Sequence, residues 1–560
     1  MFEIFLASFT SSVVILGIGY FFSLVFFSRS FLRTLYLSEI GIYGIIFLSF
    51  LGLLINFFYQ LDKNVGTLIV IFGFLSFIYF KGYNKLTFLF ITAFITFILI
   101  YYANVNRPDA GLYHLPVISM INDSKIIIGS SNIHFRFAHS SIIQYLSALN
   151  NNYLFSTSSI TIPSATIFSF CIFYFFENYK NSINEKDKGL SLIHFFIIIF
   201  SLYSFNRYSS YGNDVSAHLL YFTLVIKLIS YTSLTKIRIN DFYSISLLSL
   251  FLFANKLFMG IVLIIPLILF FLSKEKIEII KTKNFVICFF LFSLWVTKSI
   301  LTSGCVLYPV NKTCFKNLKI YDENKTTIEA QSGEAWSKDW VNQSSDIMEF
   351  QDYNRDFNWL YTWTNNHFKK ILEKLGPFIG FLFLIFILLI FGRGNKRDKN
   401  KNQPIYMKQY HLVLIISVSF TIIWFVKFPI YRYGMSFIAI SLIFLFYKLF
   451  IKNLYLTDFN KLKKIFNTIL IISIFGFCLK NGLRIKDKFE NNTKNAWPDI
   501  YSEKGDFNKN NFMQIKKDNK IMYYFSEGKL CMYSKAPCSN YLIKNLNIDI
   551  KKGYNIFWID

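Results

Sequence analysis

Long apolar runs along the whole chain are the feature that most restricts its fold. About fourteen of them approach the roughly 17–25 residues that a helix needs to cross a bilayer. With 54% hydrophobic residues and a mean hydropathy of +0.41, a soluble domain of 560 residues could not bury this apolar surface. We therefore predict an all-α polytopic membrane protein with about 12–14 transmembrane helices. The candidate spans are residues 3–27 (a retained first span), 38–59, 66–80, 86–102, 153–177, 190–205, 215–233, 242–254, 257–273, 284–301, 376–392, 408–427, 434–451 and 465–480.

The formal charge of +25 is explained by short basic connectors between these runs. Lys and Arg concentrate in cytoplasmic loops of polytopic proteins, so nucleic-acid binding is not needed to explain the charge. If the connector around Arg29 is cytoplasmic, the N-terminus lies outside and every other basic connector also falls inside. Anionic lipid headgroups are then natural partners of these connectors.

The two candidate spans in 242–273 form either a tight hairpin or one long tilted helix.

The outer loop at 106–149 is the first long polar interruption, and it contains several ionisable residues. Asp109 follows Pro108 and precedes a probable helix. It is either an N-cap carboxylate or a general base that takes a proton from an acceptor hydroxyl. Tyr113 and His114 would lie near the same helical face and could orient the acceptor or a leaving phosphate. Residues 141–149 have helical periodicity but are too short to span, so we expect a helix along the membrane interface.

A second acidic motif, Asn213-Asp214, opens a later span from the same side. His218 lies four residues after Asp214, on the same helical face. Asp214 is read as an N-cap or as a residue of the acceptor site. A divalent metal held by this pair and the loop histidines is a weaker alternative, and no metal site is assigned.

Three basic residues are candidates for binding a donor phosphate. Lys256 interrupts an apolar run, where an ionisable residue is costly and is often functional; the alternative is a snorkelling side chain at a helix end. Arg432, in KFPIYRYG, and Arg136, in the first outer loop, offer guanidinium groups that fit phosphate oxygens.

The remaining outer segments are a loop at 302–374 and a polar tail. Trp336, Trp340, Trp359 and Trp363 of the loop could stack on sugar rings or belt the membrane interface. Two tail segments, YYFSEGKLCMY and YNIFWID, read as strands of a small extramembrane domain. Four outer cysteines allow three pairings, and the local pairs Cys305–Cys314 and Cys531–Cys538 are favoured. The predicted divisions are 1–102 (N-terminal helices), 103–152 (catalytic-type loop), 153–301 (central helices), 302–375 (large outer loop), 376–480 (C-terminal helices) and 481–560 (small outer domain).

These motifs together resemble the membrane glycosyltransferases of the GT-C superfamily, such as protein O-mannosyltransferases and lipid A aminoarabinose transferases. The resemblance is carried by DAGLYHLP at 109–116, Asn213-Asp214, Asn255-Lys256, Leu307-Tyr308-Pro309 and Arg432-Tyr433. It implies Asp109 as the catalytic residue, and it links Asp214, Lys256 and Arg432 with acceptor or donor phosphate. GCVLYPVNKTCF and LCMYSKAPC also resemble uncharacterised bacterial membrane proteins tied to surface polysaccharide.

The resemblance implies an inverting glycosyltransferase of the bacterial inner membrane, with its active site facing the periplasm. It would move a sugar from a polyprenyl-phosphate-linked donor to a glycan, lipid or protein acceptor of the cell envelope. Two alternative functions are also compatible with these sequence features. An O-antigen-type polysaccharide polymerase would depend on arginines such as Arg136 and Arg432 instead of a carboxylate. A flippase or transporter of lipid-linked sugar would carry charges deep in several spans.

Overall fold

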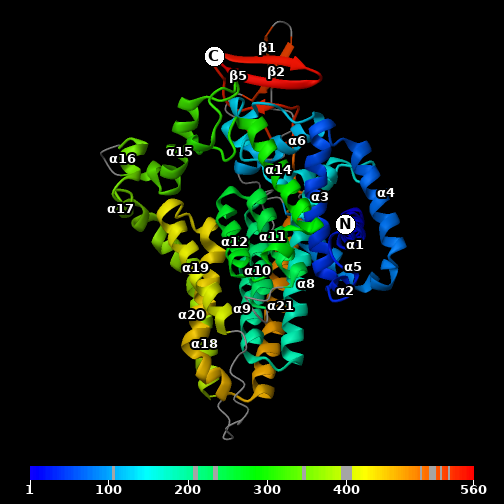
Figure 1. Ribbon diagram of the computed structural model, residues 1–560, viewed down its shortest axis with the longest axis vertical. Helices are drawn as coiled ribbons and strands as arrows, with labels where there is room; N and C mark the ends of the chain where they lie inside the picture. The colour runs from blue at the N-terminus through cyan, green and yellow to red at the C-terminus, as the bar shows by residue number, and fades with distance from the viewer. Residues whose placement is uncertain are drawn as a thin grey trace.

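The computed structural model describes residues 1–103, 108–205, 212–230, 238–343, 348–391, 407–491, 495–502, 512–517, 520–526 and 530–560. The basic run at 392–401 and most of the loop before Asp214 lie outside the described residues. Within these residues the fold is a bundle of helices with a small strand region at one end, where the C-terminus also lies (Figure 1).

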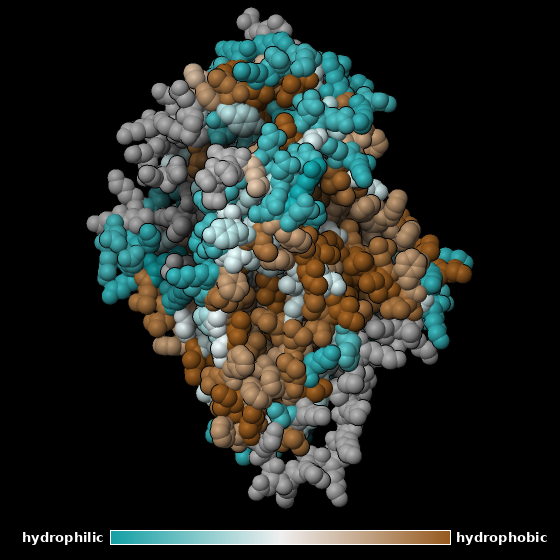
Figure 2. All heavy atoms as spheres, turned by 90° about the vertical axis from the view of Figure 1, so that its left-hand side faces the viewer, coloured by the Kyte–Doolittle hydropathy of each residue, from teal (hydrophilic) through white to brown (hydrophobic). Residues whose placement is uncertain are grey.

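A helix coincides with each of the fourteen apolar runs. The long bundle helices are α1 (Phe2–Phe26), α3 (Leu37–Phe58), α4 (Lys63–Tyr79), α5 (Leu86–Ile100), α8 (Ile162–Asn184), α9 (Lys188–Ser204), α10 (Asp214–Ile229), α11 (Ile239–Asn255), α14 (Lys283–Ser303), α18 (Lys369–Phe391), α19 (Met407–Lys427), α20 (Tyr431–Leu456) and α21 (Phe459–Glu490). Eight helical segments in the described chain are long and apolar enough to cross a membrane, and four shorter helices are also apolar. Figure 2 shows the matching surface, an apolar belt below a hydrophilic end. The chain is thus a mainly helical, polytopic membrane protein.

The run at 242–273 is a broken hairpin, so the alternative of one long tilted helix is wrong. α11 ends at Asn255, and Lys256 has extended backbone angles. A 3₁₀ segment (Leu257–Leu263) and α12 (Ile264–Leu272) follow, and the 3₁₀ segment folds back against α11. The break brings Lys256 to the end of α11 instead of leaving it within a continuous span.

Glycines set the close approach of α1 and α3. Gly44 lies against the carbonyl of Ile15, and Gly19 lies against the carbonyl of Ile40. A Cβ atom at either position would overlap the backbone oxygen of the other helix. Small residues at such crossings allow the dense packing that associates helices inside a membrane.

The first outer loop folds into short helices that are enclosed by protein. It contains a π-helical turn, η2 (Ala110–His114), then α6 (Leu115–Asp123) and α7 (Ile142–Leu149). Ser141 and Gln144 form a capping box at the start of α7. The predicted helix forms, but all eight of its residues are buried, so it presents no face to a membrane surface.

The outer segments pack onto this loop. The 302–374 region contributes α15 (Glu323–Ser337), α16 (Phe350–Asn354) and α17 (Leu360–Trp363). The tail forms a three-stranded sheet of β1 (Met513–Lys517), β2 (Lys520–Phe525) and β3 (Cys538–Ser539), and a hairpin of β4 (Leu546–Lys551) and β5 (Tyr554–Ile559). The predicted strand in YYFSEGKLCMY is confirmed up to Phe525, and residues 527–529 of that segment lie outside the described residues. YNIFWID is confirmed as a strand up to Ile559. β5 bridges to Ile128, and the backbone N–H of Met532 donates to the carbonyl of Gly111 at 2.8 Å.

Both local disulfides, Cys305–Cys314 and Cys531–Cys538, are present in these outer segments. Two of the loop tryptophans are neither exposed platforms nor an interface belt. Trp359 and Trp363 are buried against Phe425, because the loop folds back on the outer end of α19. Trp336 is exposed, and Trp340 packs on Phe350.

Candidate functional site

Asp109 is held between two arginines from distant parts of the chain. Nη1 of Arg136 lies 3.0 Å from Oδ1, and Nη1 of Arg432 lies 3.0 Å from Oδ2. The Asp109 side chain makes no capping hydrogen bond to η2, so the N-cap alternative is wrong. The carboxylate instead links the first outer loop to the start of α20.

A second ion pair joins α10 to the α11 break. The ammonium of Lys256 contacts the carboxylate of Asp214, and it also lies 3.9 Å from the centroid of the Tyr433 ring. Asn213 occupies the N-cap position of α10, and no side chain caps that helix, so Asp214 is not an N-cap. Because Lys256 is paired and only 12% exposed, the snorkelling alternative is wrong as well.

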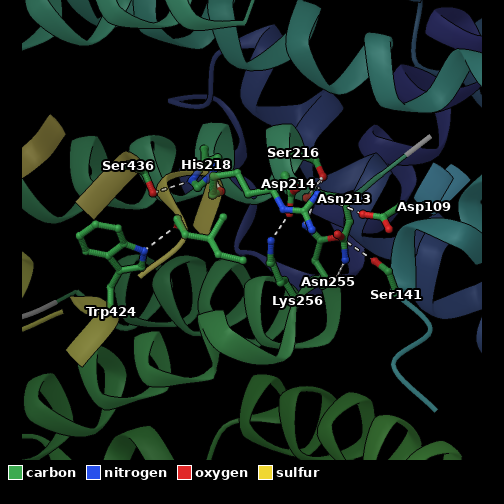
Figure 3. A network of polar contacts seen from close by, with 12 residues as sticks. Asp109, Ser141, Asn213, Asp214, Ser216, His218, Asn255, Lys256, Trp424 and Ser436 are labelled. Atoms are coloured by element: carbon green, nitrogen blue, oxygen red, sulfur yellow. Dashed lines mark hydrogen bonds and ion pairs between the residues drawn. The ribbon is translucent and has the colours of Figure 1, made fainter. Parts of the chain in front are cut away.

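Asn255 connects three helices next to the Asp214–Lys256 pair. Its amide nitrogen donates to the carbonyl of Asn213 and to Ser216 Oγ at 3.2 Å, while its Oδ1 accepts from Ser141 Oγ at 2.7 Å. Figure 3 shows Asp109, Asp214, Lys256 and Asn255 gathered in this network. One buried amide thus ties α7, α10 and α11 together directly behind the charged groups.

The sequence places His218 with the acceptor motif, and in the structure both of its ring nitrogens contact α20. It is fully buried, with Nδ1 at 2.8 Å from Ser436 Oγ and Nε2 at 2.8 Å from the carbonyl of Arg432. A carbonyl only accepts, so Nε2 carries the proton and Nδ1 accepts from the serine hydroxyl. His218 therefore fixes the backbone of α20 at Arg432. Figure 3 shows its contact with Ser436.

Two tryptophans hold the turn just before Arg432. Nε1 of Trp424 donates to the carbonyl of Ile430 at 2.8 Å, and Nε1 of Trp363 donates to that of Pro429 at 2.9 Å. The polar ends of these buried rings replace water at the turn. This is the function of Trp363 that the sequence did not indicate.

Tyr113 and His114 lie side by side, with their ring centroids 4.1 Å apart. The ring centroid of Tyr113 lies 5.0 Å from the Arg136 guanidinium, so Tyr113 lines the charged site. His114 is buried, and its Nδ1 lies 3.2 Å from Nε2 of Gln144. Burial lowers the pKa of His114 to about 4, so the imidazole is neutral at pH 7. Its contact with Gln144 connects η2 to α7.

The environment keeps Asp109 ionised. Burial by itself would raise the pKa of this carboxyl, but Arg432 and Arg136 together hold its pKa below the usual value. In the described residues the site contains two carboxylates, those of Asp109 and Asp214. It also contains three cations, those of Arg136, Lys256 and Arg432. The site therefore has one positive charge in excess and favours an anionic ligand.

The residues brought together do not form a metal centre. Over the part of the chain that the structure describes, no group of three His, Cys, Asp or Glu side chains is placed to hold a metal ion. Asp214 is paired with Lys256, and both ring nitrogens of His218 are occupied.

Sequence reasoning singled out all three cations and both carboxylates that meet here, but it missed Gln144 and Ser436. Gln144 could have been found from the S-x-x-Q spacing of the capping box. Ser436 carries no such signal, since its role depends on the crossing of α10 and α20.

Comparison with known proteins gives a family but no function. No curated protein and no solved structure matches the chain. Residues 1–439 match the family described as "Domain of unknown function (DUF8201)", and this span includes every charged residue of the site. The chain therefore belongs to the DUF8201 family.

Proposed function

We propose that this protein is an inverting glycosyltransferase of the bacterial inner membrane. It would transfer a sugar from a polyprenyl-phosphate donor to a cell-surface glycan, lipid or protein on the periplasmic face. The observation that carries the proposal is the Asp109 carboxylate between Arg136 and Arg432, beside the Asp214–Lys256 pair. The Asp109 carboxylate and the three cations of the site lie where the predicted outer loops join the apolar helix bundle.

The positive excess suits a donor phosphate. Arg136 and Arg432 have side chains that are 35% and 39% exposed, so an incoming anion can reach both guanidinium groups. Guanidinium forms paired hydrogen bonds with phosphate oxygens, and Lys256 adds a point charge nearby. The apolar tail would lie along helices such as α14, α18 and α21, which bury less than a third of their apolar windows inside the protein.

Asp109 would act as the general base. It takes the proton of an acceptor hydroxyl while that oxygen attacks the anomeric carbon and the bond from this carbon to the phosphate oxygen breaks. The departing polyprenyl phosphate keeps the bond electrons, and the cations stabilise its charge. In the free protein both arginines weaken the basicity of Asp109. A donor phosphate that draws a guanidinium away would raise the pKa of Asp109 and so make it a stronger base.

The test is Asp109→Asn, made in the full-length protein in nanodiscs with an undecaprenyl-phosphate-linked sugar as donor. We expect product formation to fall by about 10²–10⁴-fold, the range typical of a lost general base. Binding of undecaprenyl phosphate should persist, because the cations remain. Asp352→Asn, at an exposed carboxylate of the outer loop, is the matched control and should keep full activity. Full turnover by the Asp109 variant would reject the role of the carboxylate.

A polysaccharide polymerase is the second candidate, since Arg136 and Arg432 converge in the same site. In that case Arg136→Gln and Arg432→Gln would stop chain extension, whereas Asp109→Asn would retain it. The flippase rival predicts movement of lipid-linked sugar across a reconstituted bilayer with no covalent product, and this would count against both enzymes.

A further inference from the structure

Residues 357–374 expose a group of apolar side chains where the large outer loop joins α18. In this stretch α17, a π-helical turn (η9, Thr364–Phe368) and the start of α18 follow one another without a break. Large apolar side chains along it are exposed: Phe357, Leu360, Tyr361, Phe368 and Leu372. A contiguous group of this kind usually marks a surface that contacts a partner or a membrane.

The 357–374 segment packs around the ends of two predicted spans. The ring centroids of Trp359 and Trp363 lie 5.5 and 5.2 Å from that of Phe425, in the last turn of α19. The indole of Trp363 also donates to the turn between α19 and α20. The ammonium of Lys374 lies 5.3 Å from the ring centroid of Tyr431, the first residue of α20. The whole segment therefore lies beside the place where α19 ends and α20 begins.

That place marks a surface of the bilayer. The apolar run of α19 ends at Lys427, and Arg432 precedes the apolar run of α20. Lysine and arginine side chains at the ends of spans extend to the level of the lipid headgroups. Figure 1 shows α17 beside this end of α19. The exposed side chains of the 357–374 segment are thus at the level of the headgroups.

The exposed apolar surface continues into a membrane span. Leu360–Phe391 is one helical segment of 32 residues, and only 28% of its most apolar part is buried inside the protein. At about 1.5 Å per residue it is about 48 Å long, whereas the hydrocarbon core is roughly 30 Å thick. The sequence at 375–391 is free of charge, so the excess length lies at the end that contains Tyr361. This end therefore extends beyond the hydrocarbon core.

The charges of the segment suit anionic lipids. Lys369 and Lys370 are both exposed and directly follow Phe368. With Lys374, the 357–374 segment contains three lysines against one acid, Glu373. Lysines beside exposed aromatic rings bind the phosphates of anionic lipids while the rings enter the headgroup region. An acidic protein could match the lysines, but it would not explain why the apolar surface is continuous with that of a span.

We propose that the 357–374 segment docks on the bilayer surface, with Tyr361 among the lipid headgroups and with Lys369 and Lys370 on the phosphates of anionic lipids. Because the segment also bonds to the turn just before Arg432, this docking holds that guanidinium at the depth of the lipid phosphates. The inference does not depend on the proposed function, since it needs only a membrane and these contacts.

The experiment measures the depth of a fluorescent label on the full-length protein in nanodiscs. Cys171, Cys288 and Cys478 are replaced by Ser, and the thiol of Tyr361→Cys carries nitrobenzoxadiazole. The nanodiscs contain phosphatidylcholine with a nitroxide either near the headgroup or deep in the acyl chain. We expect a blue-shifted emission that the headgroup nitroxide quenches more strongly than the deep one.

Two other label positions calibrate the measurement. Phe383 is exposed in the middle of α18, so a label on Phe383→Cys should be quenched mainly by the deep nitroxide. Ile328 is an exposed apolar residue of α15, close to Lys325, which bonds to the first outer loop. A label on Ile328→Cys should emit as it does in water, and neither nitroxide should quench it.

A second measurement tests the lysines in nanodiscs that mix phosphatidylglycerol with phosphatidylcholine. The Tyr361 label should report a local enrichment of phosphatidylglycerol of about fivefold, which corresponds to the roughly 1 kcal/mol that one lysine contributes near a membrane surface. Lys369→Gln combined with Lys370→Gln should remove this enrichment. Lys551→Gln combined with Lys552→Gln, at an exposed pair on the β4–β5 hairpin, should leave it unchanged.

Three results would overturn the proposal. A Tyr361 label that emits like the Ile328 label would show that the segment faces water. A blue-shifted label that no lipid nitroxide quenches would show that protein covers the segment. Equal quenching from the two lipids would remove the role of the lysines. None of these results affects the activity of Asp109→Asn, so failure of the docking and failure of the proposed function are distinguishable.

Discussion

Asp109 is an acid whose two guanidinium partners decide when it can act as a base. Removing one of them, as in Arg432→Gln, should raise the pKa of the carboxyl, because one of the two positive charges that lower this pKa is lost. A general base works only when it is deprotonated, so the acidic limb of the pH profile should move to higher pH. The measurement is kcat/KM for sugar transfer from pH 3 to pH 9, with Arg355→Gln at an exposed arginine as control. An acidic limb that stays in place would mean that another group titrates.

At this scale the sequence identified the charged residues but not their partners. Residue type and place near an outer span end were enough to select Asp109, Asp214, Lys256 and Arg432. That Asp109 pairs with Arg432 could not be read from one chain, because more than three hundred residues separate them. The partners of His218 could not be read from the sequence for the same reason, since they lie on α20.

Among the elements, the apolar runs predicted every bundle helix, because length and hydropathy are local properties. Short elements were harder to predict. The apolar pattern does not predict the π-helical turn η2, and it gives the break at Lys256 only as one of two alternatives. η2 and the break at Lys256 both contain or adjoin site residues. Departures from regular secondary structure are expected at functional sites.

The α1–α3 crossing offers a test at the element scale. Gly44→Ala would place a Cβ atom on the Ile15 carbonyl, a rigid neighbour, so the helices must separate. We expect a loss of about 1–3 kcal/mol of stability, the usual cost of overpacking, measured by thermal or denaturant unfolding in detergent. Gly476→Ala on α21, where nothing lies within 4 Å of the added atom, should be neutral or slightly stabilising. Equal stability of the two variants would show that the close crossing does not exist.

The strand region lies at one end of an apolar bundle (Figures 1 and 2). The loop that carries Asp109 lies at the same end, because β5 bridges to Ile128 and Met532 bonds to Gly111. The Cys531–Cys538 disulfide is there too, since Cys538 is in β3. Disulfides persist in oxidising compartments. α10 and α20 both begin at the site, so the described basic residues that follow them, Arg238 and Lys461, come after the opposite ends of these helices. Together these features support a periplasmic site. This orientation predicts which residues a membrane-impermeant maleimide can reach in intact cells.

Gly333 on α15 and Lys281 before α14 are both exposed, and they fall on opposite sides in the expected orientation. In a background where Cys171, Cys288 and Cys478 are replaced by Ser, Gly333→Cys should be labelled in intact cells. Lys281→Cys should be labelled only after lysis, which shows that its thiol is reactive once reached. The four disulfide-bonded cysteines stay unreactive and can remain. The reverse pattern would put Asp109 in the cytosol, where a polyprenyl-phosphate donor on the outer leaflet could not meet it, and the proposed periplasmic transfer would be rejected.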